Sequence, residues 1–159
     1  MSPQEATAST VIDFAGRLEE ESSNFYEELA AKFAENKEEF LSFAEESKKD
    51  KILILRTYQE TITDALEACF CFKGLNLEDY VISTTLRKDT SCSVALKLAI
   101  DNEQKAVQFY STIASLSKGL LATIPMAFKR VAEKRKNRQL TLRMLATKAY
   151  RTHSMQGLK

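Results

Sequence analysis

The sequence predicts an all-α fold, an antiparallel four-helix bundle with one long crossover at about residues 69–90. Two observations predict it. The 159 residues include only four glycines and two prolines, too few turn residues for a β-sandwich or a fold with many loops. Apolar residues also recur at steps of three and four over long stretches, which is the period of one helix face. A chain of this length is expected to form a single domain, 1–159.

Two helices are expected within residues 7–68, the first helix pair. The first follows an apolar stripe that runs from Thr7 to Asn36 and includes Phe14 and Leu18. The polar run 35–38 breaks this stripe. The second helix carries apolar residues at helical spacing after that run and is expected to end near Ala68.

Two more helices are expected within residues 91–150, the second helix pair. The hydroxyl of Ser91 is a suitable N-cap for the third helix, which is expected to stop near Gly119. Pro125 suits an early position of the fourth helix, which is expected to run to about Tyr150. The tail from His153 to Lys159 has no period and is expected to be frayed.

The two halves of the chain repeat one another. Glu19 is followed seven residues later by Tyr26, and Glu103 is followed seven residues later by Tyr110. Both members of the first pair lie 84 residues before their counterparts. An internal duplication explains this match.

Glu19 and Glu103 are the first candidate site residues. Each lies on the same face of its helix as the tyrosine that follows it. A carboxylate that faces an apolar interior is costly unless it is paired or binds a metal. Two carboxylates at equivalent places therefore predict a buried polar site, although both could instead lean toward the solvent edge of their stripes.

With these residues the chain resembles the rubrerythrin-like branch of the ferritin-like family, over about residues 8–148. The motif is a glutamate followed by an aromatic pair, as in Glu19 with Phe25-Tyr26 and Glu103 with Phe109-Tyr110. The resemblance implies a ferritin-like bundle with a dinuclear iron site. One Glu on each of two helices and a Glu-x-x-His pair on each of the other two would form that site. It also implies peroxide reduction, iron oxidation or related oxygen chemistry.

The second part of that motif is altered here. Segment 43–45 matches segment 131–133 at an offset of 88, which places the expected carboxylates at Ser47 and Arg135 and the expected histidines at Asp50 and Arg138. An arginine stays protonated and cannot ligate a metal. The hypothesis is that the two arginines bridge the two glutamates by charge-assisted hydrogen bonds. The predicted vestigial metal-site positions are Glu19, Ser47, Asp50, Glu103, Arg135 and Arg138, with Tyr26 and Tyr110 beside them and no catalytic residue.

The predicted function is non-catalytic, that of a structural, regulatory or partner-binding protein with no cofactor. One alternative is a metal-binding ferritin-like oxidoreductase or iron-handling protein, in which Glu19, Glu103 and Asp50 hold iron or manganese. A shifted register could instead form a carboxylate-only site for one divalent ion with Glu45, Glu46 and Glu133. Helix geometry opposes it, because Glu46 stands about 100° from Ser47 and leaves the stripe. A second alternative is an anion or nucleic-acid binder that uses the basic fourth helix.

Charge is divided unevenly along the chain. Residues 1–79 carry 18 acidic and 8 basic side chains, whereas residues 80–159 carry 4 acidic and 15 basic ones. Nine of the basic residues lie between Lys129 and Arg151. The acidic half can serve as the partner of the basic half, so we expect intrachain pairing or a homodimer rather than a nucleic-acid partner. The sequence identifies no other protein partner.

The cysteines and the N-terminus indicate the compartment. Cys69, Cys71 and Cys92 are an odd number and do not indicate a disulfide framework. We expect them to be buried as small apolar residues, the alternative being a thiolate metal site or redox pair. No apolar run approaches the ~20 residues of a membrane span, and residues 1–10 lack the features of a signal peptide. A cytoplasmic protein without a membrane partner is expected.

Overall fold

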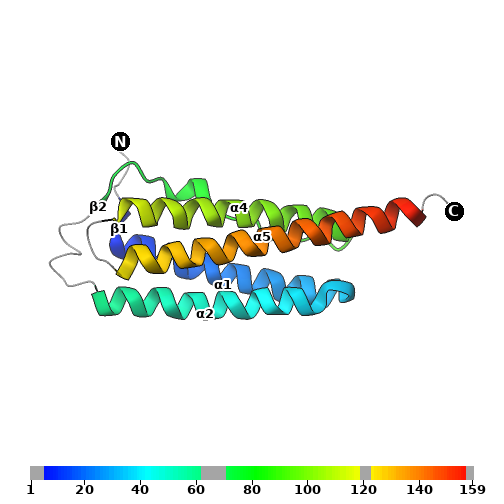
Figure 1. Ribbon diagram of the computed structural model, residues 1–159, viewed down its shortest axis with the longest axis horizontal. Coiled ribbons are helices and arrows are strands. Elements are labelled where there is room, and N and C mark those ends of the chain that lie inside the picture. Colours follow the sequence, from blue (N-terminus) through cyan, green and yellow to red (C-terminus); the bar gives the residue numbers. More distant parts are fainter. Residues whose placement is uncertain (1–5, 62–70, 119–122, 157–159) are drawn as a thin grey trace.

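The computed structural model describes residues 6–61, 71–118 and 123–156, with side chains for all of these except 61 and 153–156. Four long helices form an antiparallel bundle (Figure 1), which confirms the predicted all-α class. They are α1 (Ala8–Lys32), α2 (Lys37–Thr61), α4 (Cys92–Leu116) and α5 (Thr123–Gln156). No described helix is long and apolar enough to cross a membrane.

The first helix pair is closed by a tight turn. Thr7 caps α1, since its hydroxyl accepts a hydrogen bond from the backbone N–H of Thr10 at 3.2 Å. At Phe33 the backbone becomes extended and ends α1, three residues before the predicted end at Asn36. The 3-10 helix η1 (Ala34–Asn36) then leads into α2. The predicted end of α2 near Ala68 lies outside the described residues.

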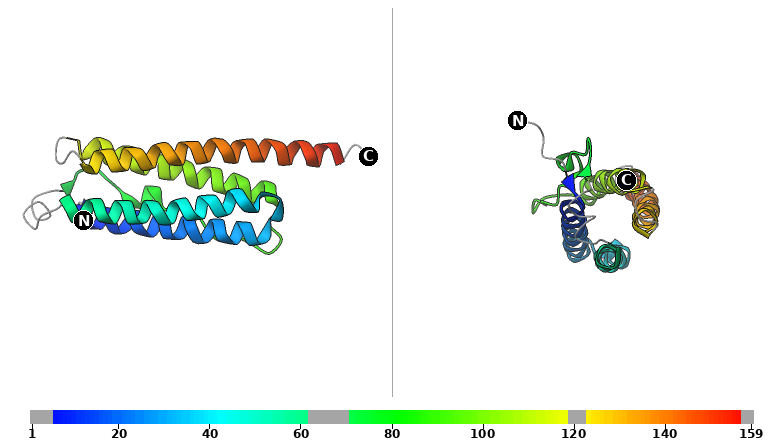
Figure 2. Two further views of the ribbon diagram at one scale, coloured as in Figure 1. Left: turned by 60° about the horizontal axis from the view of Figure 1, so that its bottom comes forward. Right: turned by 90° about the vertical axis from the view of Figure 1, so that its left-hand side faces the viewer.

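The second helix pair differs from the first at its C-terminal end. Ser91 caps α4 by accepting from the backbone N–H of Val94 at 3.2 Å, as its position predicted. Helix α5 continues to Gln156. The expectation of a frayed tail from His153 is therefore wrong for the backbone up to that residue. Figures 1 and 2 show the C-terminal end of α5 extending beyond the turn between α1 and α2.

The crossover between the pairs contacts β1, α4 and α1. Strand β2 (Cys71–Phe72) pairs antiparallel with β1 (Ala6–Thr7), a pairing that the sequence did not predict. The 3-10 helix η2 (Leu77–Tyr80) follows. Asn102 of α4 then holds Ser83, accepting from its N–H at 3.1 Å and donating to its carbonyl at 2.7 Å.

Lys32, at the end of α1, fastens the crossover further along. Its ammonium donates to the backbone carbonyls of Arg87 and Lys88. Residues 81–90 of the crossover have no regular structure, and these hydrogen bonds hold their backbone groups against α1 and α4.

The apolar core is divided into two clusters. One gathers near the strands around Phe109 and Phe128, and the other near the α1–α2 turn around Phe25 and Phe40. On every helix the residues between the two clusters include buried polar side chains. The bundle is therefore interrupted at mid-height by a polar layer.

The cysteines that the structure describes differ from the expectation. Cys71 and Cys92 are half-buried rather than fully buried, and both are free thiols. Burial raises the pKa of the Cys92 thiol, and Glu35 adds to the effect. Cys69 lies outside the described residues.

Candidate functional site

Each of the four helices contributes to the polar layer. Helix α1 supplies one predicted site residue, α4 another, and α2 and α5 two each. All six are at most 2% exposed: Glu19, Ser47, Asp50, Glu103, Arg135 and Arg138. The fold thus brings the residues singled out from the sequence into one layer of the core.

Arg135 lies at the centre of this layer. One guanidinium nitrogen, Nη2, is 2.5 Å from Oε2 of Glu19. The other, Nη1, donates to both carboxylate oxygens of Glu103, at 2.8 and 3.0 Å. Ser22 accepts a further bond from Nη2 at 3.0 Å. One buried guanidinium therefore joins the carboxylates of α1 and α4, a geometry in which charge-assisted hydrogen bonds are strong.

Arg138 lies nearer the edge of the layer. Its Nη1 donates to the hydroxyl of Ser47 at 3.0 Å and to Oε1 of Glu103 at 3.3 Å. Its Nη2 reaches Glu46 at 2.6 Å. The guanidinium carbon also lies 5.5 Å from the ring centres of Tyr26 and Phe43, within the range of a cation–π contact. Only Arg135 contacts both glutamates, so the hypothesised bridge by both arginines holds for one of them.

Glu46 is a site residue that the sequence reasoning left out. Its helical position does turn it away from the core, and its side chain is 35% exposed. The long side chain of Arg138 spans the distance from the core to this edge, as arginine side chains often do. The signal that could have identified Glu46 is its position next to Ser47, because a carboxylate beside the inward stripe is within reach of an arginine on the facing helix.

The two tyrosines connect the halves of the bundle. The hydroxyl of Tyr26 donates to Glu103 at 2.6 Å, and that of Tyr110 donates to Glu19 at 2.6 Å. Burial raises the pKa of both phenols well above the usual value, and the carboxylate that each one faces raises it further. Both therefore remain protonated donors at neutral pH.

Asp50 is held by a cation of its own. Lys134 of α5 donates to Oδ1 of Asp50 at 2.7 Å. Burial raises the pKa of Asp50, and the lysine offsets part of the rise. Lys134 was not among the predicted site residues, because it stands beside the inward stripe of α5 rather than on it and is only half-buried.

The arginines determine the charge state of Glu103. Burial alone would raise the pKa of this carboxyl, but Arg135 and Arg138 hold it below its ordinary value. Burial likewise opposes the charge on Arg135, yet Glu103 and Glu19 keep its pKa well above the ordinary range. The layer and its edge hold four carboxylates and three cations: Glu19, Glu46, Asp50, Glu103, Lys134, Arg135 and Arg138.

Four buried polar atoms in and beside the layer have no hydrogen-bond partner among the described residues. They are Oε1 of Glu19, Oγ of Ser23, Oδ2 of Asp50 and Nε of Arg135. A groove of about 430 Å³ between α1 and α2 is lined by Glu19, Ser23 and Ser47. Buried polar groups normally have a partner, and a water in this groove would supply one to Glu19 and Ser23.

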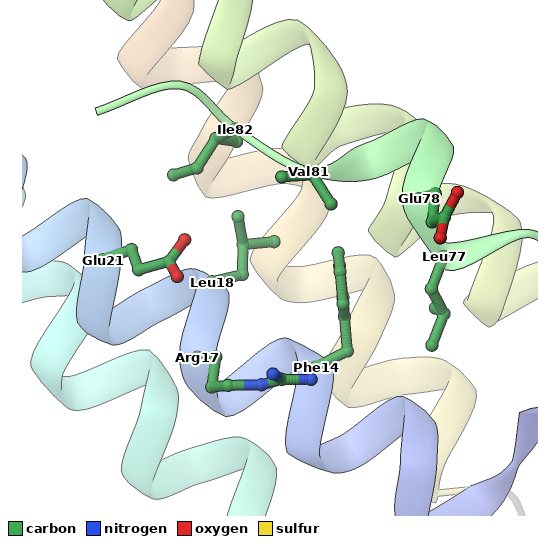
Figure 3. A pocket seen from close by; sticks show the side chains of 8 residues that line it. All are labelled: Phe14, Arg17, Leu18, Glu21, Leu77, Glu78, Val81 and Ile82. Carbon is green, nitrogen blue, oxygen red and sulfur yellow. The ribbon is translucent and has the colours of Figure 1, made fainter. Parts of the chain in front are cut away.

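A second hollow lies away from the polar layer, between α1 and the crossover (Figure 3). Its volume is about 300 Å³ and its walls are largely apolar. Its lining residues are Phe14, Arg17, Leu18, Glu21, Leu77, Glu78, Val81 and Ile82. None of the predicted site residues lines it.

Metal-binding capacity depends on which side chains converge. Within residues 6–61, 71–118 and 123–156, no three His, Cys, Asp or Glu side chains come together as a group able to hold an ion. The groups that face Glu19 and Glu103 are instead two guanidiniums and two phenols.

The fold resembles one solved structure over nearly its whole length. That structure is a crystal structure of a Thermotoga maritima protein, provisionally described as a ferritin-like diiron-carboxylate protein. The match has a TM-score of 0.75 at 21% identity, and it covers 92% of this chain and 98% of the other. No family model and no curated protein matches the sequence. The fold is thus ferritin-like, as predicted, while the rubrerythrin-like branch stays a prediction.

Proposed function

We propose that this ferritin-like chain carries a salt-bridged layer in the place of a dinuclear metal centre. Its role would then be non-catalytic, that of a structural, regulatory or partner-binding protein. The observation that carries the proposal is the position of Arg135, whose guanidinium lies within 2.5 Å of Glu19 and 2.8 Å of Glu103. A positive group stands between the two carboxylates that would otherwise be ligands.

The donor set supports this proposal. Two iron ions need several carboxylate or imidazole ligands, as in natural and designed carboxylate bundles. Here Glu103 directs both oxygens at Arg135, and Glu19 directs one of its two. Arg135 and Arg138 cannot lose their protons and cannot ligate a metal. The described residues therefore do not fit a dinuclear centre.

The structural neighbour supports the proposal that the layer replaces a metal centre. Its description as a diiron-carboxylate protein indicates that this type of bundle can house a metal pair. The motifs Glu19 with Tyr26 and Glu103 with Tyr110 are retained here, which supports the proposal that the chain descends from a metal-binding bundle of the rubrerythrin type. The changes at the four positions on α2 and α5 would then mark the loss of the centre.

Elemental analysis of bound metal tests the proposal. The protein is produced with added iron or manganese and compared with the double variant Arg135→Glu, Arg138→His, which restores ligand types. We expect no bound metal in the parent and bound metal in the variant. The pair Lys129→Glu, Arg130→His makes matched substitutions at exposed positions of the same helix and is expected to bind none.

A second candidate function has a specific observation in its favour. Oε1 of Glu19 and Oδ2 of Asp50 are buried without a partner among the described residues, and unpaired carboxylate oxygens suit a hard divalent cation. A metal-binding oxidoreductase or iron-handling protein would then use a reduced site. About one equivalent of metal in the parent, lost in Asp50→Asn, would favour this function over the non-catalytic one.

A further inference from the structure

The C-terminal part of α5 keeps one face exposed to solvent, while Leu142 and Leu145 on its other face pack into the apolar cluster near the α1–α2 turn. Figures 1 and 2 show this end extending past the turn between α1 and α2. Helices in a bundle normally bury an apolar stripe against a neighbour. Here the exposed face of α5 carries Leu140 and Met144, which are 60% and 72% exposed and lie one helical turn apart. Exposed apolar groups of this size, close together, often mark an interaction surface.

This face is also strongly basic. A groove of about 490 Å³ runs along it and is lined by apolar and cationic side chains. The groove residues that define the α5 face are Leu140, Arg143, Met144, Thr147, Lys148 and Arg151. Its three cations form no ion pair with the described part of the chain. The α5 face therefore presents uncompensated positive charge around an apolar strip.

A surface of opposite charge lies at the same end of the bundle. The acidic turn, defined here as η1 with the first turn of α2, carries Glu35, Glu38 and Glu39 beside a single exposed lysine, Lys37. Leu41 is exposed just after it. None of these three glutamates is in an ion pair with the described residues. The chain thus carries two surfaces of opposite charge, and neither forms an ion pair with the described residues of the same molecule.

We propose that the α5 face of one copy docks on the acidic turn of a second copy, and that the reverse contact forms at the same time. Because both surfaces lie at one end of the bundle, a two-fold axis at that end brings each α5 face to the partner's acidic turn. Such an isologous arrangement closes at two copies. Charge complementarity orients the pair, and the apolar strip becomes buried between the copies.

Sedimentation at several protein concentrations tests this dimer. The parent is expected to show a concentration-dependent dimer mass in the micromolar range. Two reversals are compared with it: Lys148→Glu, Arg151→Glu on the α5 face, and Glu35→Lys, Glu38→Lys on the acidic turn. Each variant alone meets like charge at both contacts, so its dissociation constant is expected to rise by about tenfold or more.

Mixing the two variants is the decisive measurement. In a mixed pair, an acidic α5 face meets a basic turn, and a basic α5 face meets an acidic turn. We expect the equimolar mixture to regain the dimer mass that neither variant shows alone. The control Lys129→Glu, Arg130→Glu reverses two exposed charges at the other end of α5 and is expected to dimerise like the parent.

Two outcomes would overturn the dimer. A parent that stays monomeric at all concentrations removes it, and so does a mixture that fails to recover. A monomeric parent that binds duplex DNA or anionic vesicles through Lys148 and Arg151 would assign the α5 face to another partner. Circular dichroism establishes that each variant is folded. The result does not depend on the metal content of the core, so failure here leaves the proposed function standing.

Discussion

The two helix pairs can be compared at their polar-layer positions. The first helix of each pair carries the same two residue types there, and the second helix carries different ones. Helices α1 and α4 match, with Glu19 and Tyr26 on one and Glu103 and Tyr110 on the other. Helices α2 and α5 do not match. The first pair supplies Ser47 and Asp50 to the polar layer, and the second supplies Arg135 and Arg138.

This difference leaves the two glutamates unequally compensated. Glu103 receives hydrogen bonds from Arg135, Arg138 and Tyr26. Glu19 receives them from Arg135 and Tyr110, and its Oε1 has no partner among the described residues. A buried carboxylate is stabilised by the donors around it. The cations of α5 therefore serve the glutamate of their own pair better than the glutamate of the other pair.

Removing Arg135 should have the largest effect, because this residue compensates both glutamates. We expect Arg135→Ala to lower the free energy of unfolding by about 3–5 kcal/mol, the cost of leaving a buried charge unpaired. Arg138→Ala should cost less, since Glu103 keeps Arg135 and the other carboxylate partner, Glu46, is partly in water.

Urea unfolding followed by circular dichroism measures these losses. Lys136→Ala is the matched control on α5, because among the described residues Lys136 pairs only with Glu133 at the surface. It should change stability by less than about 0.5 kcal/mol. A loss below about 1 kcal/mol for Arg135→Ala would contradict the importance of the buried network.

The tyrosines provide a matched pair of substitutions. Each of Tyr26→Phe and Tyr110→Phe deletes one hydrogen bond to a buried carboxylate, with an expected loss of about 1.5–3 kcal/mol. Tyr110→Phe should be the more damaging, because Glu19 then keeps only Arg135. Unfolding in urea ranks the two variants. Equal losses, or a larger loss for Tyr26→Phe, would show that the two glutamates are compensated alike.

Acid should remove the stabilisation that comes from Glu103. Its pKa is lowered on folding, so its contribution is complete above the ordinary value of 4.5 and is lost as the pH falls through the lowered folded value. Each unit of lowering is worth about 1.4 kcal/mol. The free energy of unfolding of the parent, measured from pH 7 to pH 3, should therefore fall more steeply below pH 4.5 than that of Glu103→Gln. Parallel curves would contradict the assignment.

Asp50 should show the smallest effect and the opposite sign. Burial raises its pKa, so the folded protein favours the neutral form and the charged form costs stability at neutral pH. Asp50→Asn keeps an acceptor for Lys134 and removes the charge. We expect stability at pH 7 to stay constant or to rise by up to about 1 kcal/mol. A loss of several kcal/mol would mean that the ionised carboxylate is required.

Much of the layer could be predicted because it depends on helical periodicity. Glu19, Ser47, Glu103 and Arg135 lie on inward stripes, and the offset between the halves aligns them in the sequence itself. Glu46 and Lys134 could not be found in this way. Both stand off the stripe and join the layer because a long side chain bridges the gap, in one case that of Arg138 and in the other that of Lys134 itself.

The crossover and the end of α5 were less predictable for other reasons. The pairing of Ala6–Thr7 with Cys71–Phe72 involves two residues on each strand, too few to leave an alternating pattern. The tail beyond Tyr150 lacks an apolar stripe, yet α5 continues to Gln156. Residues such as Arg151 have adequate helix propensity, so the helix continues without a stripe to bury.

The bonds from Tyr26 to Glu103 and from Tyr110 to Glu19 have a consequence for ancestry. Each one joins the first half of the chain to the second. We propose that the halves arose by duplication of a single unit, which would have needed a twin beside it to satisfy these groups. In a symmetric pair of identical units, positions 47 and 135 would necessarily hold the same residue. Under this proposal, only fusion of the two units in tandem would have allowed position 135 to become arginine while position 47 became serine.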